Sequence, residues 1–167
     1  MDKVIIWRKL DGGLSFTRIF DPTYNDYPEA YAAFLQEHRD YAVNHAHLTF
    51  EAVVDVTAMP DAGDHMKNPD EAHFKGAWVH RGKGKIVVDP MKAVEIHKQS
   101  LRVLRAPKLL ALDVEHSRAY KDPAKQDEIE AKRKVLRDVT DDPKIKAAKT
   151  LKALRKVIPA VLKEVTP

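Results

Sequence analysis

Residues 86–97 are Ile-Val-Val-Asp-Pro-Met-Lys-Ala-Val-Glu-Ile-His, and the hydrophobic pattern of the chain changes within them. Ile86 to Val88 is a short β-branched run, which is typical of a strand. Asp89 followed by Pro90 predicts the start of a helix. An aspartate at the N-cap can accept a free backbone N–H, and a proline in the next position has no N–H to satisfy. We therefore expect strands before residue 89 and helices after it.

The part of the chain before residue 89 has further strand patterns and one helical pattern. Two of the strands flank Asp11-Gly12-Gly13, and glycines here favour a tight hairpin turn. Pro28 suits the first turn of the predicted helix. We expect these elements to bury one face of a sheet. The predicted elements are strands at 3–8, 14–20, 48–57, 77–79 and 85–88, a helix at 27–44 and a loop at 59–71.

After residue 89 the apolar residues recur with helical spacing, and prolines divide the chain into segments. The Asp122-Pro123 and Asp142-Pro143 pairs repeat the helix-start signal of residues 89–90, whereas Pro107 is expected to kink or restart the first helix. Thr150 and Pro159 divide the last apolar stretch. The sequence therefore predicts an α+β protein with two parts. Residues 1–88 form a small β-hairpin/sheet module with one helix, and residues 89–167 form an all-α helical hairpin with short terminal helices.

The spacing of Val94, His97, Leu101 and Leu104 is three, four and three residues, which is the pattern of a helical seam. One interpretation is that this seam contacts another subunit. The alternative is that it forms the interior of the hairpin itself. The candidate interaction residues are Val94, Leu101, Leu104, Leu112, Ile129 and Leu136.

Composition and charge narrow the class of protein. The chain has 167 residues, of which 44% are apolar and 32% charged, so it can build a packed core. Its first apolar run is only four residues long, too short for a signal peptide or a membrane span, and no membrane contact is expected. Residues 1–89 contain 10 Lys/Arg and 14 Asp/Glu, and residues 90–167 contain 19 and 11. The basic C-terminal part suggests an acidic partner.

Patterns that would indicate catalysis are weak. The chain has no cysteine, no HExxH motif and no nucleophile elbow around its serines. Arg81-Gly82-Lys83-Gly84-Lys85 lies between two predicted strands, not between a strand and a helix as in a P-loop. The histidines offer one alternative, a zinc site that would draw on nearby acids. Its possible ligands are His45, His47, His65, His73, His80, Asp61, Asp64, Asp70 and Glu71. Their spacing matches no known ligand pattern, so no enzyme activity, cofactor or metal is expected.

The basic helices raise the possibility of nucleic-acid binding. Phosphate contacts need cations clustered on one face. Acids such as Glu128 and Glu130 interrupt the pattern, and Tyr120 is the only aromatic residue after Trp78. We expect Lys132 and Lys134 to pair with these acids at i, i+4 spacing, so nucleic-acid binding is not the favoured interpretation.

Several motifs resemble those of small proteins from tailed phages and prophages of proteobacteria. They are Asp-Gly-Gly at 11–13, Ala-Trp at 77–78, Ile-Val-Val-Asp at 86–89, RAPKLLALD at 105–113 and KRKVLRDVT at 132–140. The resemblance covers roughly residues 1–20 and 74–158, and residues 27–44 look like an insertion relative to the family.

The resemblance implies a non-enzymatic structural component of a virion, in the tail or tail-fibre region. Its partners would be other phage structural proteins, with homo-oligomers forming in the particle. Such a protein is made in the bacterial host cytoplasm and ends in the virion. The alternatives are a transient tail or tail-fibre assembly chaperone and a basic nucleic-acid-associated phage factor. No catalytic residue comes with the resemblance.

Overall fold

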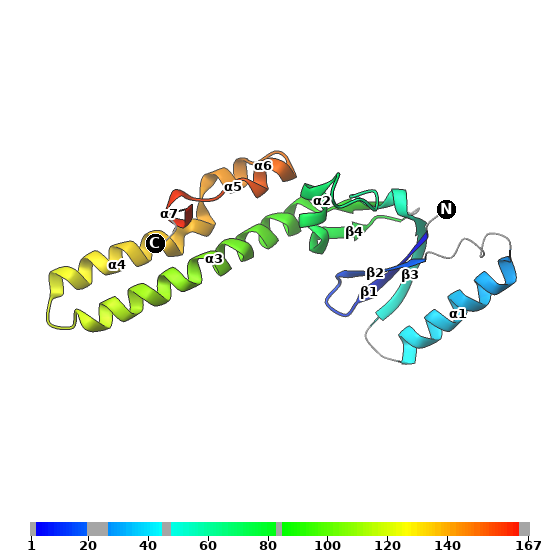
Figure 1. Ribbon diagram of the computed structural model, residues 1–167, viewed down its shortest axis with the longest axis horizontal. Coiled ribbons are helices and arrows are strands. Elements are labelled where there is room, and N and C mark those ends of the chain that lie inside the picture. Colours follow the sequence, from blue (N-terminus) through cyan, green and yellow to red (C-terminus); the bar gives the residue numbers. More distant parts are fainter. Residues whose placement is uncertain (1–2, 20–26, 45–47, 83–84, 164–167) are drawn as a thin grey trace. The chain divides into compact units, whose positions relative to one another are not determined.

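A computed structural model describes residues 3–19, 27–44, 48–82 and 85–163 (Figure 1). The chain divides into two compact units, Met1–Lys92 and Ala93–Pro167. The predicted parts were 1–88 and 89–167. The first unit contains antiparallel sheets and the second is helical among its described residues, so the α+β class is confirmed.

The first unit is built on a three-stranded antiparallel sheet. Its strands are β1 (Lys3–Lys9), β2 (Leu14–Ile19) and β3 (Leu48–Asp55), in the order β2-β1-β3. The predicted β1–β2 hairpin is confirmed, and Gly12 takes a φ of 76° in its turn. β3 ends two residues earlier than predicted, because a 3-10 turn over Val56–Ala58 follows it.

A β-bulge interrupts the pairing of β1 with β3. Ile6 pairs with Ala52 and Trp7 pairs with Phe50, so Glu51 is the extra residue on β3. A bulge changes the direction in which the extra side chain points and breaks the strict alternation of faces.

Both faces of the sheet are buried, whereas the sequence predicted one. Val4 and Ile6 belong to a cluster with Trp78 on one face. Ile5 and Trp7 belong to a second cluster on the other face, where α1 (Pro28–Asn44) packs. The prediction was wrong because β1 is apolar at four consecutive positions, and a strand with such a run is covered on both sides. Helix α1 itself is confirmed within one residue of its predicted start.

The second predicted hairpin is also present. β4 (Trp78–His80) pairs antiparallel with β5 (Ile86–Val88) in a separate two-stranded sheet. The predicted loop before it is partly wrong, since a short helix α2 (Pro69–His73) and a 3-10 turn (Lys75–Ala77) precede β4. Pro69 at the first helical position, followed by two acids, is the local signal for the start of α2.

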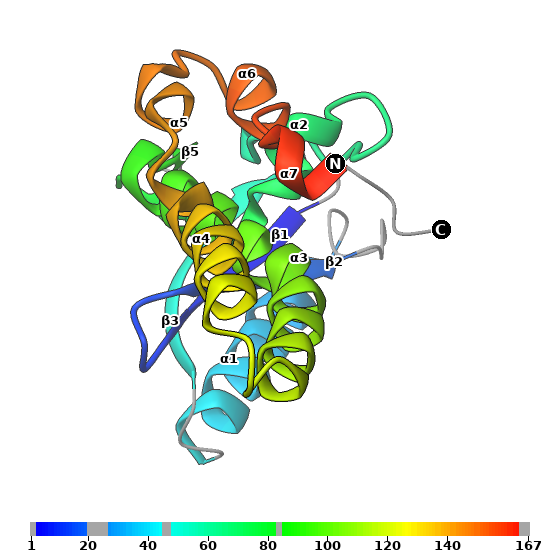
Figure 2. The same cartoon turned by 90° about the vertical axis from the view of Figure 1, so that its left-hand side faces the viewer.

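The second unit is a helical hairpin with short helices after it, as predicted. Helix α3 (Pro90–Arg118) and helix α4 (Pro123–Arg137) lie side by side and antiparallel in both views (Figures 1 and 2). Asp89 and Asp122 cap them, with Asp89 accepting from Met91 N at 2.9 Å and Asp122 from Lys125 N at 3.1 Å. Arg105 of α3 donates to the carbonyl of Leu136 at 3.3 Å and to that of Arg137.

Helix α3 runs through Pro107 without restarting. The predicted restart is therefore wrong. Proline removes a single i→i−4 hydrogen bond, and the turns on both sides keep theirs, so a helix of 29 residues can accept one proline at some cost in stability.

The short terminal helices are fixed partly by contacts to α3. They are a 3-10 turn (Asp138–Asp141), α5 (Pro143–Ala147), α6 (Leu151–Arg155) and α7 (Ala160–Lys163). His97 Nε2 donates to the carbonyl of Val157 at 2.9 Å, and Lys108 Nζ donates to the carbonyl of Val161 at 2.9 Å. Among the described residues, no helix has the length and apolar composition required to cross a membrane.

Candidate interaction surface

The structure separates the candidate interaction residues into buried and exposed positions. Leu101, Ile129 and Leu136 have exposed fractions of only 1%, 1% and 3%. They lie in the interior of the folded chain, so they cannot contact a partner while the unit remains folded. Val94 and Leu112 are partly buried, and Leu104 is 49% exposed. For Leu101 the hairpin-core alternative is therefore the correct one.

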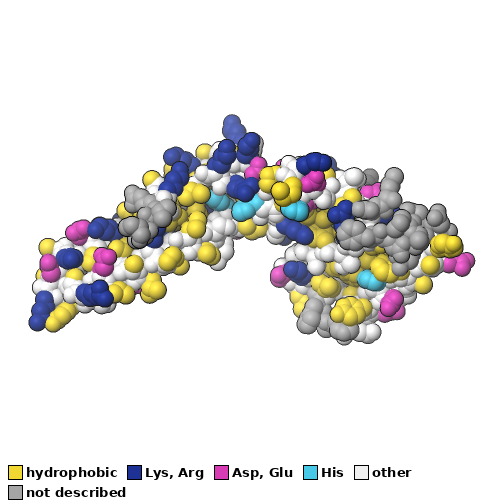
Figure 3. All heavy atoms as spheres, viewed as in Figure 1, with side chains coloured by type: hydrophobic (Ala, Val, Ile, Leu, Met, Phe, Trp, Pro, Cys, Tyr) yellow, Lys and Arg dark blue, Asp and Glu magenta, His cyan; other side chains and the backbone are white. Residues whose placement is uncertain are grey.

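A second row of apolar side chains on α3 is exposed. Val103, Leu110 and Val114 have exposed fractions of 64%, 66% and 44%, and Pro107 is also exposed. We call these four residues the outer stripe. Leu101 precedes Val103 by two residues, or about 200° around a helix, so the stripe faces away from the buried side. Helix α3 forms one edge of the helical hairpin, and Figure 3 shows hydrophobic side chains along that edge.

The seam spacing in the sequence did not indicate the outer stripe, because α3 has apolar residues on two faces. The buried seam and the outer stripe have the same three-and-four spacing, and spacing alone does not show which face the rest of the chain covers. The exposed Val103 and Leu110 could have been found by testing the spacing from every starting residue of the helix.

Residues 143–163 form a strongly basic segment. They contain seven Lys or Arg residues and no Asp or Glu, and all seven are exposed. Figure 3 shows Lys and Arg side chains gathered over α5 and α6. We call this stretch the basic segment. Its cations are Lys144, Lys146, Lys149, Lys152, Arg155, Lys156 and Lys163.

The charges on α4 differ from those of the basic segment, because acids and bases pair there. Lys132 contacts Glu128 at 2.6 Å, as predicted, and this hydrogen bond lowers the pKa of Glu128. Glu130 pairs with Arg133 at 2.9 Å and with Arg137, not with the predicted Lys134. An arginine can reach Glu130 from three or seven residues away because its side chain is long. Ion pairs within α4 thus involve Lys132, Arg133 and Arg137, whereas the sequence of the basic segment contains no acid.

The first unit has one polar cluster that the sequence did not indicate. Glu51 accepts two hydrogen bonds from Arg8 at 2.8 and 2.7 Å and one from His80 Nδ1 at 3.0 Å. The Arg8 and His80 hydrogen bonds lower the pKa of Glu51 to about 2. The bulge at Glu51 directs this carboxylate toward residues of β1 and β4. A carboxylate with so low a pKa is a weak base, and its evident role is to join the three-stranded sheet to the β4–β5 hairpin.

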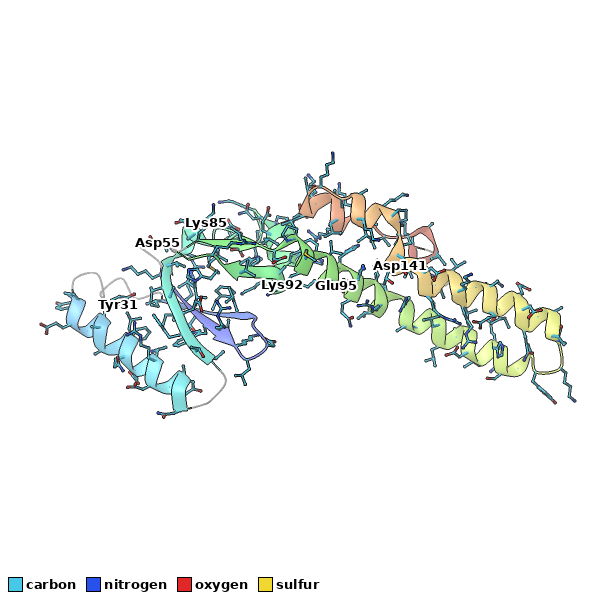
Figure 4. All side chains as sticks on the ribbon, turned by 180° about the vertical axis from the view of Figure 1, so that it is seen from behind. Tyr31, Asp55, Lys85, Lys92, Glu95 and Asp141 are labelled. Atoms are coloured by element: carbon cyan, nitrogen blue, oxygen red, sulfur yellow. The ribbon has the colours of Figure 1, made fainter. Side chains whose placement is uncertain are left out.

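An open pocket of about 650 Å³ lies at one edge of the sheet, and Lys3, Tyr31 and Asp55 are among its lining residues. Tyr31 comes from α1 and Asp55 from the end of β3 (Figure 4). Burial, and secondarily Asp55, raise the pKa of Tyr31, so its hydroxyl stays protonated at neutral pH. The Lys3 ammonium lies 4.9 Å from the centre of the Tyr31 ring. Lys3 and Asp55 are directly opposite each other on the paired strands β1 and β3. Their opposite charges cancel, so together they give the pocket no net charge.

The alternative metal site is not assembled in the described part of the chain. No group of three His, Asp or Glu side chains there could hold a metal ion. His45 and His47 lie outside the described residues. His80 Nδ1 is bonded to Glu51, and His73 packs on Phe74 with their ring centres 4.8 Å apart. Arg81–Lys85 joins β4 to β5, where Arg81 N donates to Lys85 O at 2.8 Å.

No protein-family model, curated protein or solved structure matches this chain. The resemblance to phage proteins therefore depends on the sequence motifs alone.

Proposed function

We propose that this protein works through protein–protein contacts as a structural component of a tailed-phage virion, in the tail or tail-fibre region. The observation that supports a contact role is the basic segment, seven exposed cations without an acid on a folded helical unit. The motifs at 77–78, 86–89, 105–113 and 132–140 supply the phage context. The proposed partners are other structural proteins of the particle.

The basic segment suits an acidic protein surface. Complementary charges steer two proteins together and fix their register, and exposed pairs contribute more to the rate of association than to affinity. Lysines on short helices can also adjust to the partner, because their side chains are flexible. Helix α4, with five cations and three acids, offers a less basic surface for comparison.

Mass spectrometry of purified virions tests the proposal. A structural component remains in the particle, whereas an assembly chaperone, the first alternative function, leaves before maturation. We expect the protein to be found at a constant ratio to known tail proteins. Its absence from mature particles, together with its presence in assembly intermediates, would support the chaperone.

Charge-reversed variants test the basic segment within the same experiment. We expect the triple variant Lys149→Glu, Lys152→Glu, Lys156→Glu to enter particles poorly. The matched control reverses the same number of lysine charges on and next to α4, with Lys121→Glu, Lys125→Glu and Lys134→Glu. Equal incorporation of both variants would mean that the basic segment does not contact a partner.

The basic segment also motivates the second alternative, a nucleic-acid-associated factor. Six phosphate contacts would make DNA affinity fall by about 10³-fold or more between 50 and 200 mM salt. We expect no submicromolar binding at 150 mM salt in a fluorescence-anisotropy titration with double- and single-stranded DNA. Tight binding with a steep salt dependence, abolished in the lysine triple variant, would favour the nucleic-acid function instead.

A further inference from the structure

Helix α3 has more apolar surface than its own unit covers. The inner face contains the buried Leu101, and the outer stripe exposes Val103, Pro107, Leu110 and Val114 to solvent. Apolar rows of this kind on a soluble protein usually mark a contact surface. The stripe is separate from the basic segment, and an inference about it does not depend on the proposed place in a virion.

The spacing of the outer stripe defines the shape of its partner. Successive members are four, three and four residues apart, which is the seam of a two-helix coiled coil. The four stripe residues are uncharged, and Ala106 and Ala111 beside them are small and exposed, so a second helix can approach closely. A helix with the same apolar period would fit this seam, and α3 of another copy has that period.

Two charged residues on one side of the stripe indicate the orientation. Arg102 and Asp113 are eleven residues apart, or about three helical turns, so they lie on the same side of α3. A two-fold axis perpendicular to a pair of antiparallel helices keeps that side of one copy next to the same side of the other. The axis thus brings each Arg102 to the partner's Asp113, while Val103 meets Val114. In a parallel pair the two-fold axis runs along the helices and places this side of the two copies on opposite faces of the dimer, so Arg102 and Asp113 would not meet across the seam.

The present contacts leave both charges available. The Arg102 guanidinium donates to the Gln99 side chain at 3.3 Å and forms no ion pair among the described residues. Asp113 is paired with Arg133, yet its side chain remains 49% exposed and can accept a further hydrogen bond. We propose that a second copy of this chain packs antiparallel along the outer stripe of α3, with Arg102 of each copy contacting Asp113 of the other.

Analytical ultracentrifugation of the full chain tests the proposed dimer. One helix pair buries a small interface, so we expect a monomer–dimer equilibrium that depends on concentration. Leu110→Asp should abolish the dimer and leave the helical circular dichroism spectrum unchanged, because Leu110 is 66% exposed. Val135→Asp is the matched control, since Val135 is 55% exposed on α4 and should leave the dimer intact. A wild-type chain that is monomeric at every concentration, or a dimeric Leu110→Asp variant, would overturn the proposal.

Cysteine cross-linking tests the orientation, and the chain has no cysteine of its own. We expect Val103→Cys and Val114→Cys, mixed and oxidised, to form a mixed disulfide dimer efficiently, whereas each variant alone cross-links poorly. Efficient cross-linking of each variant alone would show a parallel pair and overturn the proposed arrangement.

Discussion

Glu51 shows how a single residue can escape prediction from sequence. In a regular strand, its side chain would alternate with Phe50 and Ala52. The bulge at Glu51 breaks that alternation and brings the carboxylate to Arg8 and His80, which are 43 and 29 residues away in the chain. The position of a bulge depends on the pairing register between two strands, and the sequence pattern of one strand contains little information about that register.

The low pKa of Glu51 predicts how Glu51→Gln affects stability at different pH values. The folded pKa lies below the ordinary value, so the stabilisation is fully present above the ordinary pKa of glutamate. It is lost as the pH falls toward about 2. Because Arg8 is half exposed, water screens the pair, and we expect it to contribute about 1 kcal/mol. Chemical denaturation should show wild type more stable by that amount near pH 7, with the difference shrinking as the pH falls through about 2.

Glu128→Gln is the matched control for this experiment. Glu128 also has a lowered pKa, but both it and Lys132 are largely exposed on α4. We expect a much smaller change with pH than for Glu51→Gln. If both variants respond equally to pH, the Arg8–Glu51–His80 cluster has no special role in stability.

Element boundaries were predicted best where a local signal determines them. Asp89, Asp122 and Asp142 each accept a backbone N–H at a helix start, and each precedes a proline. Such a cap involves only residues within one turn, so its chemistry is visible in the sequence. Whether Pro107 ends a helix is decided by the packing of the surrounding turns, and α3 continues through it without a restart.

Pro107 predicts a stabilising substitution. Pro107→Ala restores an N–H that can bond the carbonyl of Val103 and removes the clash of the proline ring with the preceding turn. We expect the free energy of unfolding of the helical unit to rise by about 1–3 kcal/mol. Thermal denaturation followed by circular dichroism at 222 nm measures this change.

A proline placed one turn later gives the opposite test. Ala111 is an exposed residue inside α3, and Ala111→Pro should destabilise the unit by about 3 kcal/mol. A neutral effect of Ala111→Pro would mean that this part of α3 is not a continuous helix in solution.

The two-part organisation was visible in the sequence, but the surfaces of the parts were not. The change from strand to helix pattern at residue 89 was enough to predict the fold class. The contacts of His97, Arg105 and Lys108 with distant carbonyls depend on the final packing, and no spacing indicates them. For the same reason, the sequence selected the buried Leu101 as an interaction residue and did not indicate that Leu110 is exposed.

Folding of the helical part alone can be tested with residues 89–167, a fragment that retains Asp89 as the cap of α3. We expect a strongly helical circular dichroism spectrum and a cooperative thermal transition, because Leu101, Ile129 and Leu136 are buried and the interhelical contacts of Arg105 are retained. A random-coil spectrum would show that the helical unit requires residues 1–88 or a partner to fold.

The anchoring of the C-terminal helices has a consequence for how this region can change over generations. His97 and Lys108 bind carbonyl oxygens of the main chain at Val157 and Val161, and every amino acid has such an oxygen. A substitution at position 157 or 161 therefore leaves in place the carbonyl oxygen to which His97 or Lys108 donates. Substitutions should accumulate at 157 and 161 more freely than at His97 and Lys108, where a substitution would remove one of the contacts that hold the C-terminal helices.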